Sequence, residues 1–170
     1  MTFLKHLSLS ILTLSLLLLG GCGVYNFTGG VIPDNVKTIS IPVFYNESSS
    51  GPPNMSQIFT EQLKGYYQSN SKLAIVRESG DWQLSGYISG YVVTPLAPKA
   101  NETSSLSRLT ITVKVDFLNT KDDLRNFSQN FSFYGDFQQS QSLSSVENKL
   151  IEEIFTQIIL DIFTKTTSDW

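Results

Sequence analysis

Apolar and polar residues alternate along this chain with two different periods, and the change of period marks the expected elements. An apolar residue at every second position predicts a strand, and apolar residues three and four positions apart predict a helix. The clearest strand covers residues 109–117, where apolar side chains alternate with Thr110, Thr112, Lys114 and Asp116. We therefore expect one face of this strand to be buried and the other to meet water.

The same alternation predicts two earlier strands. Residues 36–45 form the first, and Pro42 within it predicts a bend or an edge position because proline has no amide hydrogen to donate. Residues 82–94 form a longer strand, which is expected to place Tyr87 and Tyr91 on the exposed face of the sheet. The opposite face of this strand is expected to carry Trp82, Leu84, Ile88 and Val92.

A hairpin turn at 119–123 is expected to lead into a last strand at 124–137. A short extended piece at 73–76 and a long polar loop at 95–106 separate the other elements. The inner face of the last strand is expected to carry Phe127, Phe131, Phe133 and Phe137.

Two amphipathic helices are predicted. The first begins at Asn54, which is expected to cap it, and ends near residues 69–72. The second covers residues 145–165, with Ser144 and Glu147 spaced as a capping box. Its broad apolar face consists of Leu150, Ile151, Ile154, Phe155, Ile158, Ile159, Ile162 and Phe163.

The order of these elements is strand, helix, strand, strand, strand, helix. This order predicts a two-layer α+β sandwich, in which two helices cover one face of a mixed sheet of roughly four strands. The first strand, helix and second strand predict one parallel pair, and the later strands predict an antiparallel meander. We expect residues 36–170 to form a single domain whose opposite sheet face stays exposed.

The segment before this domain has the pattern of a lipoprotein precursor. Lys5 precedes an apolar stretch at 7–19, which is too short to span a membrane, and two glycines precede Cys22. We expect residues 1–21 to be a removed signal peptide and Cys22 to carry palmitate and related acyl chains that anchor the protein to a membrane. Residues 22–35 are then a lipidated tether, in which Gly29, Gly30 and Pro33 disfavour regular structure.

The composition argues against most catalytic chemistry. The single histidine, His6, lies in the expected signal peptide, and the single cysteine is the expected anchor. The mature chain would then lack Ser-His-Asp triads, cysteine nucleophiles and His or Cys zinc ligands, so we expect no enzyme, metal or cofactor. A net charge of −3 without a basic run argues against nucleic acid as a partner. Ser69 and Lys72 have the Ser-x-x-Lys spacing of some acyl transferases, but they are expected to match it by chance in a serine-rich chain.

Two groups of residues are candidates for binding. Lys99, Arg108 and Lys114 are either ordinary surface charge or contacts to the phosphates of an anionic lipid. Two tyrosines of the strand at 82–94 and one asparagine of the loop at 95–106 are candidate partner contacts, since they offer amphipathic or polar groups on exposed elements: Tyr87, Tyr91 and Asn101.

Three stretches of the chain resemble the LptE family of lipopolysaccharide-assembly lipoproteins, in its Bacteroidetes-like form. They are Cys22 to Gly29, then Asn101-Glu102-Thr103 leading into Arg108 to Val113, and Gln139 to Glu147. The terminal helix also fits, so the resemblance covers essentially the whole mature chain.

This resemblance implies a lipoprotein on the periplasmic side of the outer membrane. It implies insertion into a large β-barrel, LptD, as a plug and assembly partner, and delivery of lipopolysaccharide to the cell surface. Two other classes stay open. One is a docking lipoprotein of another envelope machine, such as a secretin pilot or a cell-wall-binding module, and the other is a membrane-tethered hydrolase.

Overall fold

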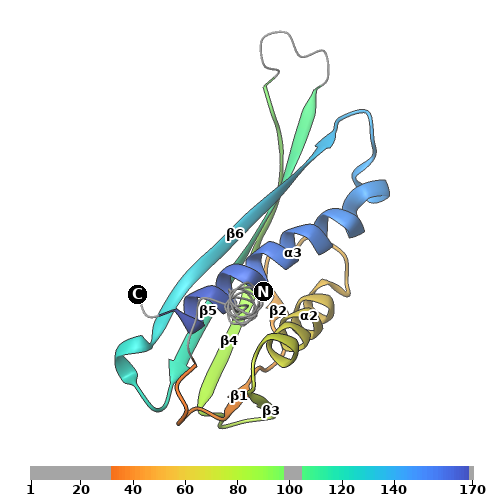
Figure 1. Cartoon of the computed structure of the whole chain (residues 1–170). Coiled ribbons are helices and arrows are strands. Elements are labelled where there is room, and N and C mark those ends of the chain that lie inside the picture. The colour runs from red at the N-terminus through yellow and green to blue at the C-terminus, as the bar shows by residue number, and fades with distance from the viewer. Residues whose placement is uncertain (1–31, 98–104, 169–170) are drawn as a thin grey trace, which may run out of the picture.

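The computed structural model describes residues 32–97 and 105–168, and these form an α+β fold (Figure 1). The helices are α2 (Met55–Asn70) and α3 (Leu143–Thr167), and a short 3₁₀ helix, η2 (Asp123–Arg125), lies between the last two strands. Both long helices lie on one side of the sheet, which confirms the predicted fold class (Figure 1). The strands are β1 (Thr38–Ser40), β2 (Tyr45–Asn46), β3 (Ala74–Val76), β4 (Trp82–Pro95), β5 (Leu106–Asn119) and β6 (Phe127–Gln138).

The sheet is mixed, with the strand order β3-β1-β4-β5-β6 and β2 paired to β4. Strand β1 runs parallel to both β3 and β4, and β2 also runs parallel to β4. The strands β4, β5 and β6 form the predicted antiparallel meander. They are the three longest strands, and the β4–β5 hairpin projects beyond the helices (Figure 1).

The predicted strand at 36–45 is in fact two short strands, so the described sheet has six strands rather than about four. Residues 41–44 between β1 and β2 carry no ladder pairing, and Pro42 lies among them. Proline cannot donate a ladder hydrogen bond, which explains the interruption. The predicted edge position is wrong for β1, which lies between β3 and β4, but it holds for β2, which among the described strands pairs with β4 alone.

The core lies between the sheet and the two helices. The apolar face predicted for the second helix is buried along α3, and Phe155 on this face packs edge-on against Phe59 of α2 with ring centroids 4.9 Å apart. The helices are also joined by a hydrogen bond of 2.6 Å between the buried hydroxyls of Tyr67 and Thr166. Burial raises the pKa of Tyr67, so this phenol stays protonated and bonded at any ordinary pH.

The start of α3 differs from the prediction. The helix begins at Leu143 after Ser142, and neither the side chain of Ser142 nor that of Asn54 at α2 makes a capping hydrogen bond. The predicted capping box of Ser144 and Glu147 is therefore wrong. Ser144 already lies within the first turn, and the carboxylate of Glu147 accepts a hydrogen bond from a sheet residue, described below.

Gly86 allows β4 and β5 to pair closely. Its φ of 158° is one that side-chain-bearing residues rarely adopt, and a Cβ there would lie 2.0 Å from the carbonyl oxygen of Lys114. This position therefore requires glycine. A glycine within a strand often marks such a close approach by a neighbour.

Candidate functional site

The sheet face turned away from α2 and α3 is the candidate site, and we call it the open face. It is formed by alternate residues of β4, β5 and β6 and by Tyr45 of β2, whose register partner is Tyr87. Most of its side chains are hydroxyls or amides. On the two outer strands of the meander they include Gln83, Ser85, Tyr87, Val92, Thr94, Ser128, Asn130, Ser132, Tyr134 and Asp136, and on β5 Arg108, Thr110, Thr112, Lys114, Asp116 and Leu118.

Hydrogen bonds made by serine and threonine hydroxyls join the strands across this face. The hydroxyls of Thr112 and Ser132 share a hydrogen bond of 3.0 Å, and Ser132 also donates to the carbonyl of Ile111 at 3.2 Å. Ser128 donates to the carboxylate of Asp116. The open face is therefore an ordered polar surface, in contrast to the apolar face beneath the helices.

Arg108 lies on the open face with a partner of its own. Its guanidinium donates two hydrogen bonds to Asp136, at 2.7 and 2.9 Å, and its carbon lies 3.5 Å from the ring centroid of Tyr134. The bond to Asp136 raises the pKa of Arg108 above its ordinary value. The positive charge of Arg108 is thus neutralised by the Asp136 carboxylate. A phosphate would have to compete with Asp136 for the two N–H groups of the guanidinium.

Lys114 shares the open face with Arg108 but lies far from it. The two are six residues apart on β5, which is about 20 Å at the rise of a strand. In register, Lys114 lies between Tyr87 of β4 and Asn130 of β6. The sequence grouped these cations with Lys99, but one phosphate cannot contact both Arg108 and Lys114, and Lys99 lies outside the described residues.

Besides Tyr134, which lies under Arg108, two tyrosines form the aromatic part of the open face. Tyr87, a predicted partner contact, pairs in register with Tyr45, whose side chain is 68% exposed. Sequence reasoning did not select Tyr45, because the segment 36–45 was interpreted as one strand and its true register against β4 was not known. The other loop candidate, Asn101, lies outside the described residues.

Tyr91 lies on the opposite side of the sheet from its prediction. The β4–β5 register shifts between Ile88 and Gly90, so a β-bulge at this point reverses the faces of the residues that follow. Tyr91 consequently packs against the core and donates a hydrogen bond to Glu147 of α3, whereas Val92 becomes 55% exposed on the open face. The placement of Tyr91 on the open face was wrong because period-2 alternation does not survive a bulge.

Two pockets lie at the ends of α3. One, of about 350 Å³, lies between η2 and the C-terminal turn of α3, next to Arg125 and Lys165. The other, of about 290 Å³, lies between the end of β6 and the start of α3, next to Phe137 and Lys149. Both have mixed polar and apolar walls.

The residues that suggested an enzyme do not form an enclosed site. Ser69 is exposed in the last turn of α2, and Lys72 is exposed just after it. Among the described residues, no three His, Cys, Asp or Glu side chains gather closely enough to hold a metal ion. None of the described helices combines the length and apolar character that crossing a membrane requires.

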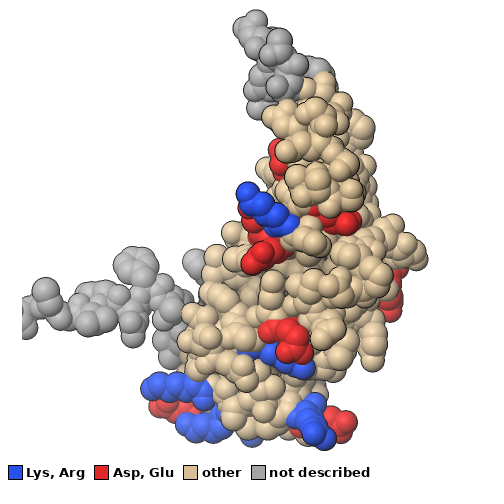
Figure 2. Space-filling view, turned by 90° about the vertical axis from the view of Figure 1, so that its right-hand side faces the viewer, with Lys and Arg blue, Asp and Glu red and all other residues tan. Residues whose placement is uncertain are grey.

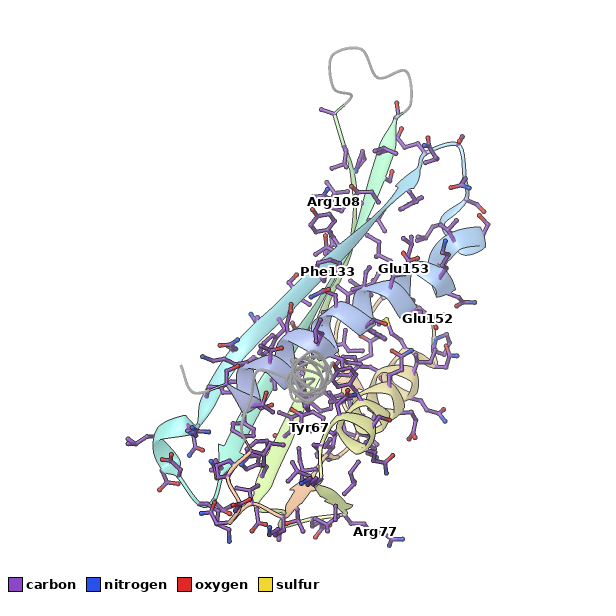
Figure 3. All side chains as sticks on the ribbon, viewed as in Figure 1. Tyr67, Arg77, Arg108, Phe133, Glu152 and Glu153 are labelled. Atoms are coloured by element: carbon purple, nitrogen blue, oxygen red, sulfur yellow. The ribbon has the colours of Figure 1, made fainter. Side chains whose placement is uncertain are left out.

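Charge is also mixed on the side of the molecule that lies to the right in Figure 1. In Figure 2, lysines and arginines lie next to aspartates and glutamates, and much of the upper half of that view is uncharged. Glu152 and Glu153 project from α3, and Arg77 projects from the lower end of the molecule (Figure 3). A strongly basic or acidic surface is absent from the view.

Known structures share this fold. A minor lipoprotein from Acinetobacter baumannii aligns with a TM-score of 0.52 and 12% identity, over 78% of this chain and 94% of that one. A protein from Xanthomonas campestris aligns with a TM-score of 0.54 and 12% identity, over 84% and 88%. A putative neuraminyllactose-binding hemagglutinin homologue from Helicobacter pylori aligns with a TM-score of 0.53 and 11% identity, over 85% and 92%.

Sequence comparison gives the family. Comparison with curated protein sequences finds no match. A family model described as LptE, lipopolysaccharide-assembly, matches residues 36–166, which include every described strand and helix up to the last turn of α3. The chain therefore belongs to the LptE lipopolysaccharide-assembly family.

Proposed function

We propose that this protein is a non-catalytic outer-membrane lipoprotein that plugs an LptD-like β-barrel and helps it to assemble. In this role it supports delivery of lipopolysaccharide to the cell surface. Membership of the LptE family supports the proposal at the level of lipopolysaccharide assembly. The polar open face supports the more specific role as a plug.

The open face is the observation on which the docking proposal depends. Barrel interiors are polar and hydrated, so a surface of hydroxyls and amides can lie against them without burying unpaired charges. The charges of the Arg108–Asp136 pair are already matched. Tyr45 and Tyr87 add amphipathic rings of the kind that is enriched at protein interfaces.

A photocrosslinking experiment tests which side of the protein docks. We expect a photoreactive residue at Tyr87 to crosslink to a large barrel protein in living cells. The same residue at Glu152, which is exposed on α3 on the other side of the molecule, is the control and should give little of this product. Recovery of a secretin or a cell-wall protein from Tyr87 would support the docking-lipoprotein alternative and contradict our proposal.

The anchor proposal is tested separately. We propose that the mature protein begins at Cys22, which carries the acyl chains, and that residues 22–35 connect it to the periplasmic side of the outer membrane. Mass spectrometry of the purified protein should find an acylated N-terminal cysteine. Exchange of Cys22→Ser should move the protein from the membrane fraction to the soluble periplasmic fraction.

We also propose that lipopolysaccharide phosphates contact the protein at two separate places, Lys114 and Arg108, with Lys99 as a third candidate. At Arg108 the phosphate would replace Asp136 in the guanidinium fork. Lys114→Gln and Arg108→Gln should each weaken binding of purified lipopolysaccharide. Lys149→Gln is the matched control, because Lys149 is a highly exposed lysine on α3.

A further inference from the structure

The larger of the two pockets lies between the C-terminal turn of α3 and the connection from β5 to β6 (Figure 1). Two aromatic rings form part of its wall, since Phe117 and Phe127 line it and stack on each other with centroids 5.3 Å apart. Phe117 also packs edge-on against Trp82, whose side chain is fully buried. A row of aromatic rings therefore runs from the core to this pocket, whose volume of about 350 Å³ leaves room for a further ring.

A strongly exposed leucine lines the same pocket. Leu124 is 97% exposed, although the turn that carries it is held by hydrogen bonds. The amide of Leu124 donates to the carboxylate of Asp122 at 3.2 Å, and the amide of Asn119 donates to the side chain of Asn126 at 2.7 Å. Single exposed leucines are common on protein surfaces, so this one matters because of its place beside two aromatic rings.

The chain leaves α3 at this pocket. Ser168 is the last described residue, and it lines the pocket. Its backbone is extended, and its amide donates to the carbonyl of Thr164 at 2.9 Å. The next two residues in the sequence are Asp169 and Trp170, which lie outside the described residues. Because two residues span at most about 7 Å of backbone, the indole of Trp170 is within reach of the pocket.

We propose that the indole of Trp170 inserts into this pocket and covers the exposed leucine. A tryptophan buries roughly 150–250 Å² of surface, and the neighbouring phenylalanine rings offer it stacked or edge-on contacts. Arg125 and Lys165 also line the pocket, and a cation near the face of an indole adds an electrostatic attraction. The contact joins the end of α3 to the turn after β5, so the pocket holds the protein's own side chain and is closed to a ligand.

A double-mutant cycle in the full-length, detergent-purified protein tests the contact. Truncation of an exposed leucine hardly changes stability unless another side chain packs on it. We expect Leu124→Ala to raise the equilibrium constant for unfolding about fivefold in the parent chain, but less than about twofold in the Trp170→Ala chain. Urea denaturation followed by circular dichroism measures both. Leu160→Ala is the matched control, because Leu160 is an exposed leucine on α3, and its effect should be the same in both chains.

Quenching of tryptophan fluorescence gives a second measurement. The chain has two tryptophans, and Trp82 is fully buried, so acrylamide in the solvent reports mainly on Trp170. We expect slow quenching in the parent chain and clearly faster quenching in the Leu124→Ser chain. The proposal is wrong if these two chains are quenched equally, or if Leu124→Ala has the same effect with and without Trp170.

Crosslinking identifies the occupant directly. A photoreactive residue at position 124 should join to the peptide of the same chain that contains Trp170, as found by mass spectrometry. If it joins instead to a second protein, the pocket receives a partner's side chain and the proposal is wrong. Capture of a barrel from Tyr87 is scored in a separate experiment, so failure of one proposal does not imply failure of the other.

Discussion

At the scale of single residues, two polar contacts join segments that are distant in the chain. The carboxylate of Asp81 accepts hydrogen bonds from the amides of Lys37 and Thr38, at 2.9 and 3.1 Å, and pairs with Lys121 at 2.8 Å. It thereby joins β1, the start of β4 and the turn after β5. The Tyr91–Glu147 hydrogen bond joins β4 to the start of α3 in the same way.

The Asp81 contact should make stability depend on pH. Lys121 and the amide of Lys37 hold the pKa of the Asp81 carboxyl well below its usual range. Because the folded pKa is lower than the unfolded one, ionised Asp81 stabilises the protein above about pH 4, and this contribution is lost as the pH falls below that value. We expect Asp81→Asn to lower Tm at pH 7 and the difference from the parent to narrow below about pH 4.

Thermal melting at a series of pH values measures this difference. Glu152→Gln is the control, since Glu152 is an exposed carboxylate on α3. If the difference in Tm between Asp81→Asn and the parent stays constant with pH, the charge of Asp81 does not contribute to stability.

The bond between Tyr91 and Glu147 can be removed without loss of the aromatic ring. Tyr91→Phe should lower the free energy of unfolding by about 1 kcal/mol, because one partly buried hydrogen bond is lost and the ring still packs. Urea denaturation should show a lower midpoint with an unchanged slope. Tyr87→Phe, on the open face, should leave the midpoint of the isolated protein unaltered.

At the scale of elements, β4 decides how the two faces of the sheet are composed. Its close approach to β5 at Gly86 and its bulge before Gly90 occur within a few residues. The bulge turns Tyr91 toward the helices and Val92 toward water. The face that a partner would meet is therefore set by one irregularity within a strand of otherwise regular pairing.

The two glycines of β4 should respond differently to the same substitution. Gly86→Ala places a Cβ against backbone of β5 and should destabilise the protein by about 1–3 kcal/mol or more. In Gly90→Ala the new Cβ would lie 3.3 Å from the side chain of Thr112, so this substitution should lower the free energy of unfolding by clearly less. Chemical denaturation of the two variants side by side measures this. Equal losses would show that the close approach at Gly86 does not govern strand pairing.

The elements with sustained periodicity were predicted from sequence, and the irregular ones were not. Helix α3 and strand β5 have long, regular patterns of apolar residues, so their buried and exposed faces were predicted correctly. The faces predicted for β4 beyond Ile88 were wrong, because a glycine within a strand can mark either a bulge or a close approach, and the sequence does not show which of the two occurs at Gly90. The capping box at Ser144 was also wrong, because Glu147 has a tertiary partner, Tyr91, that local sequence does not reveal.

At the scale of the whole molecule, an uncovered polar sheet face and a helix-covered apolar face make the protein strongly two-sided. Sequence predicted this division, because alternation along β5 requires one wet face. It did not predict how far apart the binding candidates lie. Arg108 and Lys114 lie about 20 Å apart on β5, although the sequence analysis treated them as one basic group.

The matched Arg108–Asp136 pair on the open face predicts how docking depends on salt. Since the Arg108–Asp136 pair needs no charge from a partner, we expect the proposed complex with the barrel to survive a rise in salt from about 0.1 to about 1 M, where exposed charges are screened. Co-purification from detergent at both salt concentrations checks this. Loss of the barrel at high salt would indicate that long-range charge attraction, rather than polar surface contact, holds the complex together.

The position of α3 in the chain has a consequence for how this protein reaches its native state. Synthesis proceeds from the N-terminus, and α3 is the final described element, so the sheet residues are made before the helix that covers them. Until Leu143–Thr167 has been synthesised, the apolar inner faces of β5 and β6 are not covered by a helix, and this exposed apolar surface can aggregate. The nascent chain therefore needs either rapid completion or a chaperone that holds it until its last helix arrives.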